Sequence, residues 1–229
     1  MKKFAIMLTA VMCICVSCGE KNNSESTSEP VQDTTIVTEV ITDVPEKISE
    51  RDGGYDEVIN SYKKCMEINN VGNMMKLSYP DRYFEIFSFM AEISGMTVEE
   101  VMGTIQSYAD NTIRMNEIIS DETVDNPEDI MDILIENYGD YQIISDYIDE
   151  QGGMEKVDTE KFNEFMDSAE YDSENIKLYF KPENIHRIKC EMESFTKGEE
   201  SEAENYEQEF IVYYIDGEGW KIDTYLTEE

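Results

Sequence analysis

Residues 210–223 read FIVYYIDGEGWKID, and the fold that we expect for the chain follows from the pattern of these residues. Two runs of β-branched and aromatic residues flank Asp216-Gly217-Glu218-Gly219, a glycine-containing segment that is typical of a hairpin turn. The pattern therefore predicts two antiparallel strands, at about residues 206–215 and 220–226.

The register of this hairpin decides which side chains share a face of the sheet. Pairing Ile215 with Trp220 puts Tyr213 opposite Ile222, on the more apolar face. We expect amphipathic helices to cover that face. The other face is half polar and includes the charged side chains of Lys221 and Asp223.

Upstream of the hairpin, most of the domain has the three- and four-residue spacing of buried helix faces. Pro80, the capping-box pair Thr97 and Glu100, and Asn126-Pro127 mark helix starts. The expected helices cover about residues 55–69, 80–95, 97–119, 126–139 and 158–169, and the further strands cover about 141–148 and 185–195. The fold class is α+β, with N-terminal helices packed on a curved antiparallel sheet of about four strands.

The first residues have the pattern of a secretory signal. Lys2 and Lys3 precede an apolar run from Phe4 to Val16, which has 13 residues and is shorter than the roughly 20 that span a bilayer. The following Ser17-Cys18-Gly19 resembles the lipobox of bacterial lipoproteins. That resemblance implies cleavage before Cys18, a lipid on Cys18, and a protein anchored on the extracytoplasmic face of the cell membrane.

The chain then divides into three segments. Residues 1–17 are the expected lipoprotein signal peptide, and residues 18–53 are an acidic, Ser- and Thr-rich tether in which Thr35 to Ile41 could form an extended segment. Residues 54–229 are the expected α+β domain.

Charge excludes one class of partner. The formal net charge is −34, and such a field repels phosphate backbones, so we expect no nucleic-acid partner. It also repels anionic lipid headgroups, so the expected membrane contact is the lipid on Cys18.

The residues carry no recognisable catalytic or metal-binding motif, and we expect no cofactor and no metal. The chain has one histidine, His186, which fits a surface or strand-edge position better than a base. Cys65 and Cys190 lie in apolar patterns, where buried free thiols are common, although pairing in an oxidising compartment stays open.

The segment from Val212 to Asp223, supported by the helix at residues 55–69, resembles the end of the nuclear-transport-factor-two-like, or cystatin-like, α+β roll. It is similar in particular to the C-terminal domains of Gram-positive lipoproteins that end in a strand, an Asp-Gly turn, a Trp and a final strand. Enzymes with this roll often use a His–Asp pair or clustered carboxylates in the cone of the sheet.

Three functions remain open at this stage. The first is a non-catalytic module that binds a small molecule or an envelope protein, the second is a hydrolase or isomerase, and the third is a passive envelope component. For a binding pocket on the apolar face, the candidate lining residues are Tyr147, Met192, Tyr213 and Trp220.

Overall fold

The computed structural model describes residues 54–108, 111–169, 173–196 and 203–225. The long helices are α2 (Tyr55–Glu67), α3 (Val71–Ser78), α4 (Asp81–Ile93), α5 (Val98–Tyr108), α6 (Glu128–Gln151) and α7 (Thr159–Ser168). Two short 3-10 turns, η1 (Met154–Lys156) and η2 (Ser173–Asn175), follow α6 and α7. The strands are β1 (Asn111–Val124), β2 (Pro182–Thr196), β3 (Glu204–Ile215) and β4 (Gly219–Tyr225).

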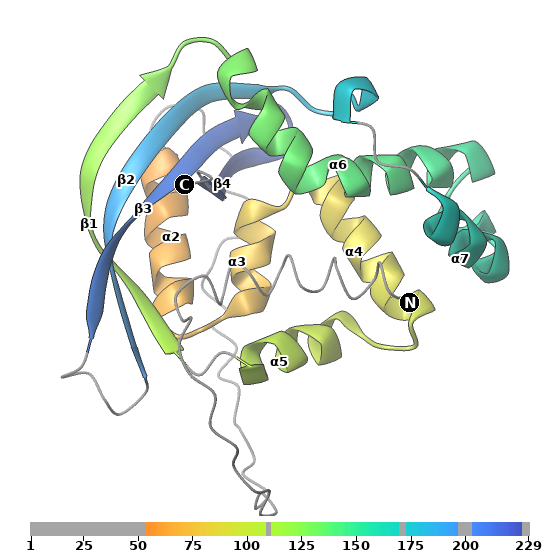
Figure 1. Cartoon of the computed structure of the whole chain (residues 1–229), viewed down its shortest axis with the longest axis horizontal. Coiled ribbons are helices and arrows are strands. Elements are labelled where there is room, and N and C mark those ends of the chain that lie inside the picture. Colours follow the sequence, from red (N-terminus) through yellow and green to blue (C-terminus); the bar gives the residue numbers. More distant parts are fainter. Residues whose placement is uncertain (1–53, 109–110, 170–172, 197–202, 226–229) are drawn as a thin grey trace, which may run out of the picture.

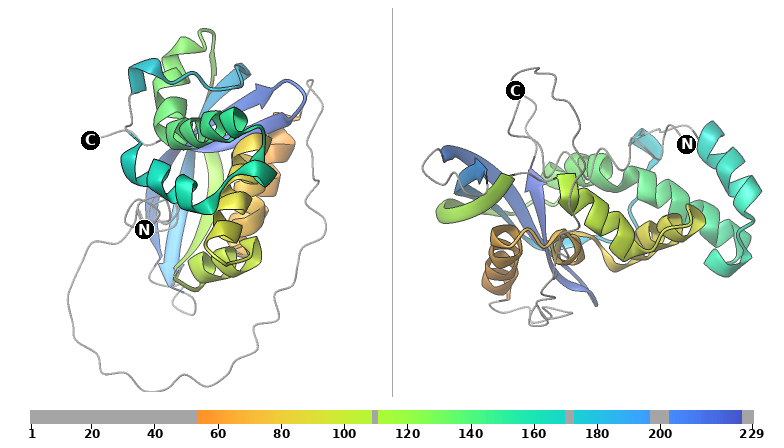
Figure 2. Two further views of the ribbon diagram at one scale, coloured as in Figure 1. Left: turned by 90° about the vertical axis from the view of Figure 1, so that its right-hand side faces the viewer. Right: turned by 90° about the horizontal axis from the view of Figure 1, so that it is seen from below.

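The four strands form one antiparallel sheet in the order β1-β2-β3-β4, with helices packed against it (Figure 1). This arrangement confirms the α+β class that the sequence predicted. The sheet curves, and α2 lies against it, whereas α4, α6 and α7 extend away to one side (Figure 2).

Both faces of the sheet carry buried side chains. The core next to α2, called the α2-side core, is built from Val58, Tyr62, Ile188, Phe210, Val212 and Ile222, among others. The core on the other face, called the α6-side core, is built from Tyr83, Leu134, Tyr138, Ile185, Ile211 and Tyr213, among others. The sheet is therefore an internal layer at the end where β3 and β4 meet.

Several predicted helix starts are confirmed. At the start of α5, the Thr97 amide donates to Glu100 Oε2 at 2.7 Å and the Glu100 amide donates to Thr97 Oγ1 at 3.2 Å, as a capping box requires. Asp158 accepts the Lys161 amide at 3.0 Å and caps α7. Helices α2 and α4 also lie where their apolar spacing predicted.

The helix expected from residue 97 to about 119 is wrong in its second half. Helix α5 ends at Tyr108, and β1 begins at Asn111. Met115 and Ile118 are three residues apart, a spacing that is typical of a helix. In the structure they belong to a strand, because β1 has register irregularities on either side of Ile118. Extra residues at such bulges break the period of two that identifies a strand.

The expected end of the next helix at Gly139, and the strand expected at residues 141–148, are also wrong. Helix α6 continues to Gln151, because the buried face of Leu134 and Tyr138 continues through Ile144. A helical glycine costs only about 1 kcal/mol, which packing readily offsets. Gly152, with a φ of 86°, ends the helix.

The expected hairpin register is wrong by one residue. Ile215 pairs with Gly219, Tyr214 with Trp220, and Tyr213 with Lys221. The reason is a shorter loop, since the Glu218 amide donates to the Ile215 carbonyl at 3.1 Å and closes the turn earlier. Because of this shift, each side chain of β4 points to the face of the sheet opposite to the one expected.

Candidate functional site

The predicted lipid-attachment residue, Cys18, lies outside the described residues, as do the signal and tether segments at 1–17 and 18–53. The described chain begins at Gly54, immediately before α2.

The four candidate pocket residues lie in three places. Met192 and Trp220 are buried in the α2-side core, and Tyr213 is buried on the opposite face of the sheet. Tyr147 lies on α6 and stacks on Phe165 of α7, with ring centroids 4.2 Å apart. The structure thus places Met192 and Trp220 in the α2-side core, and Tyr147 at the margin of the α6-side core that contains Tyr213.

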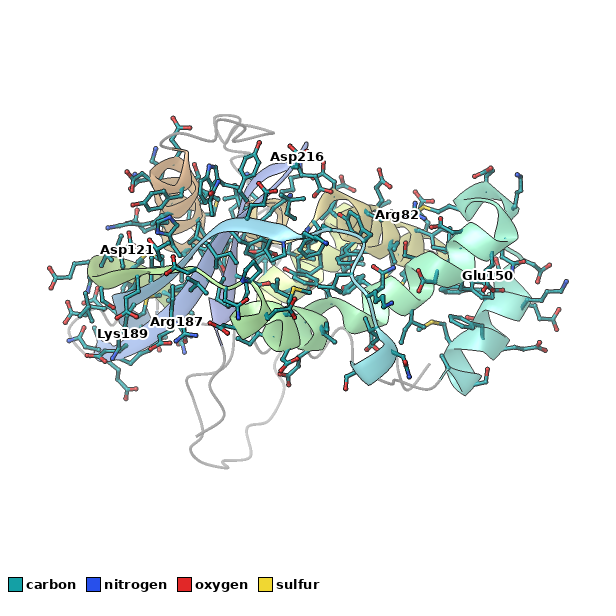
Figure 3. The ribbon with its side chains drawn as sticks, turned by 90° about the horizontal axis from the view of Figure 1, so that it is seen from above. Arg82, Asp121, Glu150, Arg187, Lys189 and Asp216 are labelled. Atoms are coloured by element: carbon teal, nitrogen blue, oxygen red, sulfur yellow. The ribbon has the colours of Figure 1, made fainter. Side chains whose placement is uncertain are left out.

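The single histidine lies in a polar and aromatic cluster on the α2 side of the sheet. His186 is on β2, an internal strand, and its Nδ1 lies 2.9 Å from Asp121 Oδ1 on β1. The Tyr55 hydroxyl donates to Asp121 Oδ2 at 3.1 Å, and this hydrogen bond is the main cause of a raised Tyr55 pKa. Figure 3 places Asp121 on the sheet side of the molecule, far from Glu150 on the helical arm.

Two aromatic rings pack against the His186 ring. Tyr55 stacks on the His186 ring with centroids 4.3 Å apart and planes inclined by 16°. The Trp220 ring packs against both, with its centroid 5.6 Å from that of Tyr55 and 6.2 Å from that of His186. We call Tyr55, Asp121, His186 and Trp220 the histidine cluster. Because Asp121 holds Nδ1, Nε2 is the ring nitrogen that remains for a ligand or a proton.

A second polar group is buried on the opposite face. The Asp223 carboxylate accepts the Tyr138 hydroxyl at 2.6 Å and the Thr224 amide at 3.0 Å. Burial raises the pKa of Asp223 to about 6, against the opposing effect of its hydrogen bonds from Tyr138 and Asn137. The carboxyl is thus held near the midpoint of its titration at mildly acidic pH.

Tyrosine rings enclose this carboxyl. Tyr138 packs edge-on against Tyr79 and stacks on Tyr83, with centroids 5.6 Å and 5.4 Å apart. Burial raises the pKa of Tyr79, Tyr138 and Tyr213 well above the ordinary value, so all three remain neutral. The Tyr213 hydroxyl is also buried and lies near that of Tyr138, which lowers the Tyr213 pKa against the larger effect of burial.

Lys221 lies two residues before Asp223 and faces the same core. Its ammonium donates to the Tyr79 carbonyl at 2.7 Å and to Asp81 Oδ1 at 3.1 Å, while only 5% of the side chain is exposed. Tyr79 and Asp81 lie at the junction of α3 and α4, so this contact fixes that junction to β4.

Sequence reasoning placed Lys221 and Asp223 on a half-polar face and did not select them as site residues. The one-residue register shift brings both onto the α6-side core, opposite Tyr213 and Ile211. The length of the turn would have indicated these positions. A three-residue loop at 216–218, with Gly219 as the first residue of the next strand, predicts the observed pairing.

The two cysteines of the domain are free and buried in the α2-side core. Burial raises the pKa of both Cys65 and Cys190 to about 11. At neutral pH they are therefore protonated and poorly reactive.

Among the described residues, no group of three or more histidine, cysteine or acidic side chains is arranged to hold a metal ion. Within the same ranges, every helix is too short or too polar to cross a membrane.

No protein-family model, no curated protein and no solved structure matches this chain.

Proposed function

We propose that this protein is a lipoprotein held on the extracytoplasmic face of the cell membrane by a lipid on Cys18. Its domain then serves as a non-catalytic module that binds a small molecule or an envelope protein. The observation that carries the proposal is Ser17-Cys18-Gly19 directly after a basic start and a short apolar run. Two or more acyl chains hold a protein stably on a bilayer, so the proposed anchor needs no membrane-spanning helix.

The positions of the polar side chains support a non-catalytic domain. Lys221 and Asp223 are both buried and bond to neighbouring parts of the fold, where they join β4 to the helical layer. One face of the His186 ring is covered by Tyr55, and its Nδ1 is held by Asp121. Such contacts indicate a structural role, because they connect β4 to the helices and β1 to β2.

We further propose a relationship to the nuclear-transport-factor-two-like, or cystatin-like, rolls. In those rolls a long first helix packs on a curved antiparallel sheet, as α2 packs on β1 and β4 here. Helices α3, α4, α5 and α7 extend this chain beyond the simplest rolls.

Mass analysis of the protein from the membrane fraction tests the anchor. The expected mass corresponds to a chain that starts at Cys18 and carries acyl groups, and Cys18→Ala is expected to leave the membrane fraction. Cys13→Ala is the matched control, because Cys13 is removed with the signal peptide, and it should still pellet with membranes. An unacylated mature chain would overturn the proposed anchor.

In-cell cross-linking and native mass spectrometry test the binding role. A reproducible adduct with one small molecule or one envelope protein is expected, and its loss in a surface variant would locate the site. A domain that gives no adduct in either experiment would favour the passive envelope component.

The geometry of His186 favours one alternative, a hydrolase or isomerase. A histidine with Nδ1 held by a carboxylate and Nε2 left for a proton has the arrangement of a general base. Turnover of ester, phosphoester or glycoside substrates that is lost in His186→Asn and Asp121→Asn, but kept in Glu122→Gln, would replace the binding proposal. Glu122 is an exposed neighbour of Asp121 on the same strand and serves as the control.

A further inference from the structure

Strand β1 forms a long free edge of the sheet. It is the first strand in the order β1-β2-β3-β4, and its outer side pairs with none of the described residues. In Figure 1 no helix lies beyond this edge. The Asn116 carbonyl in the middle of β1 accepts a hydrogen bond from Lys63 Nζ at 3.0 Å. The other backbone groups that point away from β2 are available to pair with another strand.

Two large apolar side chains are exposed near the centre of this edge, next to the exposed Glu117. Ile118 and Ile119 are 44% and 48% exposed, and they are two of only four large hydrophobic side chains exposed among the described residues. Edge strands of soluble proteins are commonly short, charged or bulged, which discourages pairing. Strand β1 has register irregularities on either side of Ile118, but it is long, with 14 residues against seven in β4 at the other edge.

The chain itself contains a segment suited to this edge. Residues 34–42 read TTIVTEVIT, and eight of the nine are β-branched. Such residues favour the extended backbone of a strand. The rest of the tether is rich in serine, acidic residues and proline, so this run stands apart from its surroundings.

The tether enters the domain beside the same strand. Helix α2 begins at Tyr55, whose hydroxyl bonds to Asp121 of β1. Residues 43–53 lie between the β-branched run and Gly54, and 11 residues reach at most about 36–40 Å. Ile118 and Ile119 are three and two residues from Asp121, roughly 10 Å or less along a strand, so the run reaches this part of the edge easily.

We propose that residues 34–42 add to the free edge of β1 as a fifth strand. A short connection gives the segment an effective concentration on the order of millimolar at this edge. A second copy of the chain is a weaker occupant, because each copy carries a net charge of −34 and the two repel one another.

Strand addition also shortens the free tether. Residues 18–33 would remain, with a root-mean-square span of about 22 Å in place of about 33 Å for residues 18–53. The domain of an acylated protein is then held closer to the bilayer. The pairing itself does not depend on acylation of Cys18.

Amide hydrogen exchange on the mature chain carrying Cys18→Ser tests this pairing. Amides of residues 35–41 and the outward-facing amides of β1 are expected to exchange about tenfold or more slower than in an unstructured chain. Val37→Pro removes a backbone donor in the middle of the run and should return both sets to fast exchange. Val31→Pro makes the same change outside the run and should leave both sets protected.

Unprotected amides at residues 35–41 would overturn the proposal. Protection of β1 that rises with protein concentration, without protection of residues 35–41, would assign the edge to a second copy and would also overturn it. A repeat on the acylated protein in detergent micelles should give the same protection pattern. Mass analysis of Cys18 is a separate measurement, so failure of the anchor and failure of the strand addition are distinguishable.

Discussion

The hydroxyl of Tyr138 on α6 donates a 2.6 Å hydrogen bond to the carboxylate of Asp223 on β4. The same hydroxyl lies 3.2 Å from the carbonyl of Ser78, the last residue of α3. One phenol therefore connects the last strand to two helices. The contact depends on the hairpin register, because a shift of one residue would turn Asp223 to the other face.

The raised pKa of Asp223 makes stability depend on pH in a definite direction. Asp223 titrates near pH 6 in the folded protein and near 3.8 when unfolded, so the folded state binds the proton more tightly. The contribution of this group is greatest below pH 3.8 and is lost as the pH rises through 6, by about 3 kcal/mol. We expect Asp223→Asn, which stays neutral, to gain that amount relative to the wild type between pH 4 and pH 7.

Urea unfolding of both proteins at each pH measures this difference. The other acidic residues contribute to both curves and cancel in the comparison. A difference between the two proteins that does not change with pH would contradict the assignment.

Loss of the Tyr138 hydroxyl should destabilise the domain. Tyr138→Phe removes the donor to a buried carboxylate, and we expect a loss of about 1–3 kcal/mol in the free energy of unfolding at pH 7. Tyr213→Phe is the matched comparison, because it removes a buried tyrosine hydroxyl that is not hydrogen-bonded to the Asp223 carboxylate. Its removal should cost less than removal of the Tyr138 hydroxyl. Equal losses in the two variants would indicate that ring packing, and not the hydrogen bond, is responsible.

The contact between Tyr55 and Asp121 should fasten the first turn of α2 to β1. In a double-mutant cycle of Tyr55→Phe and Asp121→Asn, we expect a coupling of about 0.5–1 kcal/mol, as for partly exposed polar pairs. The cycle is measured by urea unfolding. A second cycle with Asp125→Asn, an exposed acid beyond the end of β1, should give no coupling. Coupling of the same size in both cycles would contradict a direct contact.

The thiols of Cys65 and Cys190 should not react with thiol reagents in the folded protein. Both thiols are buried with a pKa of about 11, so in a chain of residues 18–229 carrying Cys18→Ser a thiol reagent at pH 8 should modify them only after unfolding. Two thiols should then appear in denaturant without a reductant. A requirement for reductant would show instead that the two cysteines pair.

The sequence predicted the elements whose start signals are local. The capping residues Thr97 and Asp158 and the apolar face of α2 depend on neighbours within one or two turns, so they are readable without the fold. Strand β1 was missed because its bulges hide the alternation of side chains, and such bulges are stabilised by the partner strand β2. The end of α6 was missed because a glycine that breaks an isolated helix is tolerated where the helix packs.

The candidate site was less predictable. His186 was visible as the only histidine, but Asp121 was one of 52 acidic residues, and only the pairing of β1 with β2 selects it. Lys221 and Asp223 were assigned to a half-polar face because the turn was read as one residue longer than it is.

The local features of the chain follow from its residues alone: a short apolar start before Cys18, helices with apolar faces, and a hairpin at Asp216–Gly219. Periodicity and turn type depend on residues that are close together in the sequence, so these features can be predicted without knowledge of the fold. The burial of Asp223 among tyrosines, the stacking of His186 on Tyr55 and the exposure of Ile118 and Ile119 at an open edge become apparent in the folded domain alone. Each of these outcomes depends on strand register and strand order, which are set by contacts between segments far apart in the chain.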